Sequence, residues 1–122
     1  MTQSVCEICR YTAALAGKNI IRANSFFNGR IDVLVNNAGY LARENFTDVT
    51  SEEIDKSMAV NLKSAVKLSQ ASLSHLQRSK GNIVNVSSIA GLRAYPGALA
   101  YKMSKAAMDQ MTRCVTLEVR TH

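Results

Sequence analysis

The chain has 122 residues, which is room for one domain of ordinary size. Hydrophobic residues make up 47% and charged residues 20%. This balance excludes intrinsic disorder, and no apolar stretch approaches the roughly 20 residues of a membrane-spanning helix. The net charge of +6 could attract nucleic acid, but no Lys/Arg-rich run occurs. We therefore expect the basic residues on solvated helix faces, and neither nucleic acid nor membrane as a partner.

Two of the three cysteines, Cys6 and Cys9, have the spacing of a redox pair or of half a zinc site. No second pair and no histidine at ligand spacing accompanies them, so we interpret them as small core residues and predict no metal site. The sparse, odd cysteine count fits a reducing compartment. With no secretory signal and no apolar span, the sequence favours a cytoplasmic protein.

The N-terminal third has two kinds of pattern. Residues 5–15 and 19–28 show the apolar spacing of helices, and Gly29 follows as a helix stop. Residues 31–35 (IDVLV) form a short run of branched apolar side chains, which is typical of a strand buried on both faces. The segment 36–39 (NNAG) then has the composition of a turn.

A long helix is predicted after the turn segment. Thr50 and Glu53 have the spacing of a capping box, in which each side chain satisfies a backbone N–H of the first helical turn. The helix should end near Lys80-Gly81, with one apolar stripe that holds Ile54, Met58, Leu62, Ala65 and Leu76.

Three further elements are expected: a buried strand at 82–87, a loop at 88–97 and a helix from 98 to about 119. The order is then helix, strand, helix, strand, helix. Because each connection between strands is helical, the sequence predicts an α/β fold with parallel strands.

Polar residues gather around this predicted framework. Tyr101 and Lys105 are four residues apart on one helix face, where a nearby ammonium group lowers the pKa of a tyrosine. Such a tyrosine can exchange a proton with a substrate oxygen near neutral pH. Ser88 follows a buried strand, where open α/β sheets bind ligands. Asn61 falls on the buried stripe of the long helix, and Gly39 would let backbone approach a ligand closely. Each of these residues could also be merely structural.

Four segments in this order and spacing resemble the short-chain dehydrogenase/reductase family: 30–39 (RIDVLVNNAG), Asn61, 82–91 (NIVNVSSIAG) and 101–105 (YKMSK). The sequences of these segments are especially similar to those of reductases of the 3-oxoacyl-carrier-protein reductase and glucose dehydrogenase type. The resemblance covers about residues 30–119, whereas residues 1–29 match the family poorly. It implies part of a Rossmann-like, doubly wound parallel sheet.

The resemblance also implies a reaction and a role for each residue. The reaction is hydride transfer between NAD or NADP and a small carbonyl or secondary alcohol. The resemblance implies that Tyr101 is the acid or base, and that Lys105 depresses the pKa of Tyr101 and binds the nicotinamide ribose. It implies that Ser88, rather than Ser87, orients the carbonyl, and that Asn61 holds a water in a relay to Lys105. It also implies that Asn36, Ala38 and Gly39 lie along the adenine-side ribose and brace the sheet.

The sequence departs from the family at both ends. The glycine-rich turn T-G-x-x-x-G-x-G does not occur, and neither does the strand expected after the catalytic helix. We therefore expect a chain truncated at both ends, unstable alone, with apolar sheet surface left uncovered at Ile31, Val33, Val35, Ile83 and Val86.

Two alternatives to an active oxidoreductase remain at this stage. One is a catalytically inactive fragment or isoform that still forms homo-oligomers through helices 51–80 and 98–119, which match subunit-contact helices of the family. The other, a basic nucleic-acid-binding module, rests only on the net charge.

Overall fold

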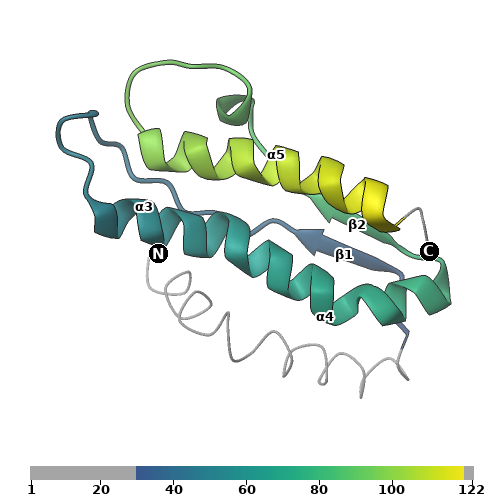
Figure 1. Ribbon diagram of the computed structural model, residues 1–122. Coiled ribbons are helices and arrows are strands. Elements are labelled where there is room, and N and C mark those ends of the chain that lie inside the picture. The colour runs from purple at the N-terminus through teal and green to yellow at the C-terminus, as the bar shows by residue number, and fades with distance from the viewer. Residues whose placement is uncertain (1–29, 120–122) are drawn as a thin grey trace. The chain divides into compact units, whose positions relative to one another are not determined.

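The computed structural model describes residues 30–119 (Figure 1), and these divide into two compact units. The first unit holds residues 30–36 and 63–86, and the second holds residues 37–62 and 87–119. The expected helices at 5–15 and 19–28, together with the Cys6–Cys9 pair, lie outside the described residues.

The first unit is a two-stranded parallel sheet covered by one helix. Strand β1 (Val33–Asn36) pairs with strand β2 (Asn82–Asn85), with Val33 opposite Asn82 and Asn36 opposite Asn85. Helix α4 (Ser64–Ser79) packs against both strands (Figure 1). The parallel pairing and the helical crossover confirm the predicted α/β fold. β1 begins two residues later than the apolar run suggests.

The strands are not buried on both faces, and that expectation is wrong. Side chains alternate between the faces of a strand, and Asn36 of β1 contacts Ser69 of α4. Val33 and Val35 therefore face away from α4, and they are 55% and 56% exposed. Val84 and Val86 are exposed as well. The uncovered apolar surface predicted from the sequence is present, although Ile31 and Ile83 are only half-exposed.

The turn from α4 into β2 depends on a close backbone approach. Lys80 ends the helix in the left-handed conformation (φ 56°), and the Gly81 N–H donates to Leu76 O at 2.8 Å. The next residue, Asn82, donates its N–H to Asp32 O at 2.9 Å. A Cβ at Gly81 would lie 2.9 Å from both the Asp32 carbonyl carbon and Leu76 Cδ2. Only glycine lets the segments at Asp32 and at residue 81 meet here without a displacement of the backbone.

The second unit begins with an exposed segment that leads into helix α3 (Ser51–Met58). Thr50 caps this helix, and its hydroxyl accepts the Glu53 N–H at 3.2 Å. The reciprocal half of the predicted capping box is absent within the described residues, because the Glu53 carboxylate accepts the Tyr40 hydroxyl at 2.8 Å instead. A π-helical turn (Ala59–Lys63) follows α3 in the chain and leads into α4.

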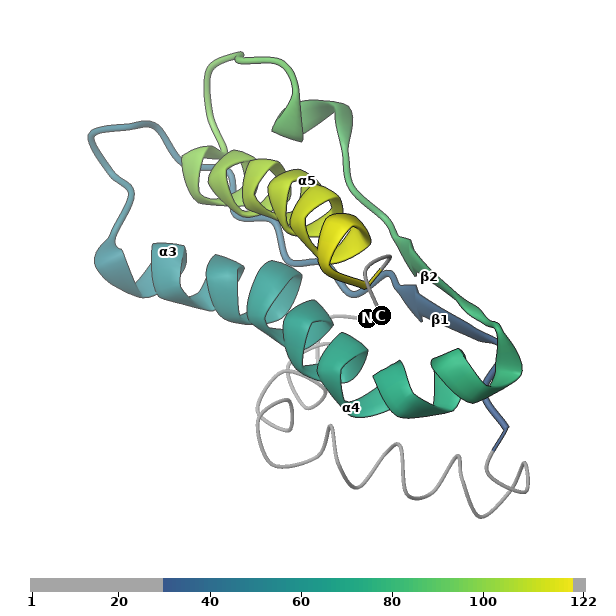
Figure 2. The ribbon, with the colours of Figure 1, turned by 45° about the vertical axis from the view of Figure 1, so that its right-hand side comes forward.

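The second unit ends with a short 3₁₀ turn (Ile89–Gly91) and the long helix α5 (Leu99–Val119). Both α3 and the 3₁₀ turn pack against α5 (Figure 2). The core between them contains Val60 and Met108, each at most 2% exposed. The helix predicted from residue 98 therefore begins one residue later, and the predicted loop contains a short helical turn.

The buried face of the helices is more polar than the apolar stripe predicted. Ala65 and Leu76 are buried, but Ile54, Met58 and Leu62 are only half-buried. The most deeply buried helical positions include several serines: Ser57, Ser64, Ser69, Ser72 and Ser104. A serine is small enough to let helices approach closely, and its hydroxyl can bond within the protein.

Two kinds of feature are absent from residues 30–119. None of these helices combines the length and apolar character needed to cross a bilayer. No group of three or more His, Cys, Asp or Glu side chains in this range is arranged to hold a metal ion.

Gly81→Ala should destabilise the first unit, because the added methyl group overlaps Asp32 and Leu76. We expect a loss of about 1–3 kcal/mol in unfolding free energy, as for other overpacked sites. Urea denaturation followed by circular dichroism measures it. Gly39→Ala is the matched control, because a Cβ there meets only Asn37 O at 4.0 Å. Equal stability of the two variants would contradict the account of the turn.

Candidate active site

A fully buried amide lies at the centre of the second unit. Asn61 is 0% exposed and sits in the π-helical turn. Its Oδ1 accepts the Tyr40 N–H at 2.6 Å, and its Nδ2 donates to Tyr40 O at 2.9 Å. The same Nδ2 lies 2.8 Å from Ser104 Oγ and 3.2 Å from Ser57 Oγ. The side chain therefore binds the backbone after the NNAG segment, α3 and α5 at once.

Tyr40 is held by its side chain as well as by its backbone. Its hydroxyl donates to Glu53, and the Lys56 ammonium lies 4.2 Å from its ring centroid. Burial, followed by the hydrogen bond to Glu53, raises the pKa of Tyr40. This tyrosine therefore stays protonated and serves to fix the segment after Gly39.

Tyr101 and Lys105 lie on one face of α5, as their spacing predicts. The Lys105 ammonium is 5.7 Å from the centroid of the Tyr101 ring. Lys105 is only 3% exposed, which is rare for a lysine, whereas Tyr101 keeps partial access to solvent. Burial lowers the pKa of Lys105, and the negative charge of Asp109 opposes that shift.

Asp109 continues the same helix face one turn beyond Lys105. Its Oδ2 is buried and has no hydrogen-bond partner within the described residues. A Cβ on Gly91 would lie 2.7 Å from this oxygen and 3.0 Å from the Lys105 carbonyl carbon. The absence of a side chain at Gly91 thus lets the 3₁₀ turn pack directly on the backbone of α5 beside Lys105.

The two serines after β2 have different partners. The Ser87 hydroxyl donates to Lys105 O at 3.4 Å and ties this segment to α5. The Ser88 hydroxyl oxygen accepts the Ala90 N–H at 3.1 Å and caps the 3₁₀ turn. Because that bond uses only the oxygen of Ser88, its hydroxyl hydrogen remains free to donate to a ligand.

The residues of the NNAG segment are divided between the units. Asn36 lies in the first unit, is 5% exposed and donates to Asn85 Oδ1 at 2.7 Å and to Ser69 Oγ at 3.2 Å. Its side chain thus joins the two strands and α4. Ala38 and Gly39 lie in the second unit and are exposed, so their backbone is accessible to a ligand.

The second unit therefore contains six of the seven predicted site residues, among them Tyr101, Lys105, Ser88, Ala38 and Gly39. It also contains Asn61, whose side chain is occupied by protein partners. Sequence reasoning missed Tyr40, Ser57, Ser104 and Asp109. A signal was available for Ser57 and Asp109, which lie four residues from Asn61 and from Lys105 on the predicted helices.

Comparison with known proteins places this arrangement in a family. The family model described as short chain dehydrogenase matches residues 11–122, and so includes residues 11–29. An uncharacterized oxidoreductase of Thermotoga maritima is 42% identical over 91 residues, which cover 74% of this chain and 36% of that protein. Carbonyl reductase [NADPH] 2 of Sus scrofa is 41% identical over 96 residues, covering 77% and 39%.

A solved structure, ElxO with NADP bound, superposes with a TM-score of 0.80 at 30% sequence identity. The match covers 87% of this chain and 43% of that one. The chain thus spans less than half the length of the proteins it resembles. The family model and the structural match agree with the motifs and with the parallel strands, and this chain belongs to the short-chain dehydrogenase/reductase family, with part of its Rossmann-like fold.

Proposed function

We propose that this chain carries the catalytic segment of an NAD(P)-dependent oxidoreductase that interconverts a small carbonyl compound and a secondary alcohol. The observation that carries the proposal is the buried Lys105 beside the partly exposed Tyr101, with the Ser88 hydroxyl in the same unit. The names of the relatives, an oxidoreductase and a carbonyl reductase, point to the same class of reaction.

Tyr101 is the proton donor in the direction of reduction. Its hydroxyl transfers a proton to the substrate oxygen as hydride reaches the carbonyl carbon, so the C=O bond becomes CH–OH. In oxidation the same oxygen takes the proton back. Ser88 donates its free hydroxyl hydrogen to the carbonyl oxygen and orients it toward Tyr101.

Lys105 supports this step through its charge. An ammonium group close to a tyrosine favours the phenolate that Tyr101 becomes after giving up its proton. Burial strengthens the effect, because a charge shielded from water acts through a lower effective dielectric. The second unit thus holds the acid, its cationic neighbour and the orienting hydroxyl.

Either NAD or NADP fits the residues of this chain on the nicotinamide side. The bound nicotinamide supplies the hydride; the protein supplies position and electrostatics. Lys105 and Tyr101 would hold the nicotinamide ribose, and the exposed backbone of Ala38 and Gly39 would be available to the adenine-side ribose. A Cβ on Gly39 would have only Asn37 O as a neighbour, at 4.0 Å, so the protein does not crowd the backbone there. Asn36 lies in the first unit and braces the sheet of that unit.

Asn61 contributes to the proton path through backbone rather than through its amide. Each polar atom of its side chain already bonds to protein. A water that relays protons to Lys105 therefore binds a backbone oxygen of the π-helical turn. Such turns occur frequently at functional sites.

The segments 51–80 and 98–119 are the surfaces through which we propose that copies of the chain associate. This proposal is supported by the family membership alone, since these segments match helices that form subunit contacts in the family. Association would leave the acid–base residues within one subunit.

Tyr101→Phe should abolish turnover and leave cofactor affinity nearly unchanged, because it removes the proton and keeps the ring. Acid–base groups contribute about 10²–10⁴-fold to rate, and we expect a loss in that range. The assay follows NADPH or NADH oxidation with cyclohexanone as the probe. Tyr40→Phe is the matched control, since it also removes a tyrosine hydroxyl, one that donates to Glu53 and has no part in the proposed proton transfer. Full activity of Tyr101→Phe would refute the assigned role.

Asp109→Asn should move the alkaline limit of activity to lower pH. Burial lowers the pKa of Lys105 and the Asp109 charge opposes this, so the variant lowers that pKa further. The ammonium form then disappears at a lower pH as pH rises. The pH profile of kcat/KM measures the shift, with the exposed Glu52→Gln as control. An alkaline limb that does not move would show that Asp109 does not act on Lys105.

A further inference from the structure

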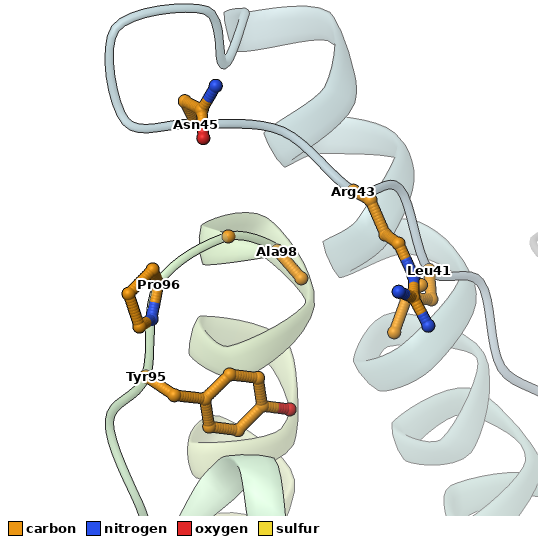
Figure 3. Close-up of a pocket in the computed structure, with 7 residues that line it drawn as sticks. Leu41, Arg43, Asn45, Tyr95, Pro96 and Ala98 are labelled. Atoms are coloured by element: carbon orange, nitrogen blue, oxygen red, sulfur yellow. The ribbon is translucent and has the colours of Figure 1, made fainter.

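A pocket lies in the second unit, between the segment after the NNAG turn and the loop before α5 (Figure 3). Its volume is about 420 Å³. Small-molecule sites usually have about 300–1,000 Å³. Leu41, Arg43 and Asn45 form one wall, and residues 95–98 form the other. None of these residues has a part in the proton-transfer chemistry proposed above.

The first wall follows the alternation of an extended chain. Leu41, Arg43 and Asn45 line the pocket, whereas Ala42 and Glu44 do not. In extended backbone, every second side chain points to the same side. The Glu44 carbonyl accepts the Ala98 N–H at 3.1 Å, so a main-chain hydrogen bond joins the two walls.

The second wall is a fixed turn rather than a loose loop. Gly97 and Ala98 both have left-handed backbone (φ 77° and 56°), which is uncommon for an alanine. Lys102 of α5 donates to the carbonyls of Tyr95 and Gly97, and its ammonium lies 3.7 Å from the Tyr95 ring centroid. Strained conformations persist where the surroundings impose them, and they cluster at ligand sites.

The lining combines an apolar surface with one cation. Tyr95, Leu41 and Pro96 present apolar surface, and Asn45 adds an amide. No carboxylate lines the pocket within the described residues. Figure 3 shows Arg43 and the Tyr95 ring on opposite walls. The Arg43 guanidinium forms no hydrogen bond or ion pair with residues 30–119, so it remains available for an anionic ligand.

The pocket adjoins the proposed acid. Ala98 precedes α5, and its carbonyl accepts the Lys102 N–H at 3.1 Å, so the first helical turn starts at Ala98. Tyr101 follows Ala98 by three residues, which is less than one turn of about 5.4 Å rise. A molecule with its reacting oxygen at Tyr101 would have to extend along the first turn of α5 to place its remaining part in this pocket.

We propose that the pocket selects carbonyl substrates with an apolar or aromatic body and an anionic group, which binds Arg43. This inference rests on the proposed function, because it names the substrate class of the same site. Tyr95 and Leu41 contact the body of the substrate, and Arg43 binds its carboxylate. The preference is a property of binding, and so it can be measured without turnover.

The test compares two aryl ketones that differ by one charge, 4-acetylbenzoate and acetophenone. Their dissociation constants for the 122-residue chain are measured by NMR chemical-shift titration. We expect 4-acetylbenzoate to bind about tenfold more tightly, the gain of one charge-assisted contact at a partly exposed site. Arg43→Gln should remove this difference, Arg43→Lys should keep part of it, and Arg93→Gln, an exposed arginine outside the pocket, should keep all of it.

The outcomes separate this inference from the proposed function. Equal affinity for the two ketones, or a preference that survives in Arg43→Gln, would overturn the assignment of the pocket. A preference that depends on Arg43, together with no reduction of 4-acetylbenzoate by NADH or NADPH, would overturn the proposed function while supporting the anion site. A preference lost in Arg43→Gln but equally lost in Arg93→Gln would show only general charge attraction and would refute the pocket.

Discussion

The amide of Asn61 is the contact on which the second unit depends. It is fully buried, and its two polar atoms bond to the Tyr40 backbone and to the hydroxyls of Ser57 and Ser104. A buried polar group left without a partner costs about 1–3 kcal/mol. Removing this side chain would take away the partner of the Tyr40 N–H and carbonyl, while Ser57 and Ser104 would keep their bond to each other and Ser104 its bond to Tyr101 O. The network therefore fixes α5, and with it Tyr101, against the segment that follows Gly39.

The position of Lys105 follows from this packing. Glycine at position 91 lets the 3₁₀ turn rest on the backbone of α5, and the Ser87 hydroxyl bonds to the Lys105 carbonyl. The ammonium is thereby enclosed near the Tyr101 ring rather than left in solvent. Enclosure costs the charged form of the lysine some stability. It also makes the charge more effective on a neighbouring phenolate.

Much of the framework could be predicted from the sequence. Branched apolar runs, a capping threonine and helical spacing predicted both strands to within two residues at each end, and also the long helical segment and α5. Those local signals did not predict the π-helical turn at Asn61, because a widened turn depends on tertiary hydrogen bonds and not on propensity. Glu53 bonds to Tyr40 rather than back to the helix start for the same reason. The exposed Val33 and Val35 show that an apolar run predicts a strand but not what covers it.

The sequence predicted the candidate catalytic residues of the site but not the pocket beside them. The order and spacing of Ser88, Tyr101 and Lys105 identified the family, which the comparisons confirm. The pocket at Arg43 and Tyr95 was not predictable, because its walls come from two loops and its shape depends on left-handed backbone at Gly97 and Ala98. Loops of this kind carry specificity on a framework that is common to many proteins.

The most direct test of the account is whether the chain binds a nicotinamide cofactor at Lys105. Nicotinamide fluorescence is followed as NADH and, separately, NADPH are titrated against the 122-residue chain and its Lys105→Ala variant. The account predicts saturable binding of at least one cofactor by the unmodified chain and clearly weaker binding by Lys105→Ala. Absence of binding at millimolar cofactor, or equal binding by the two proteins, would contradict it.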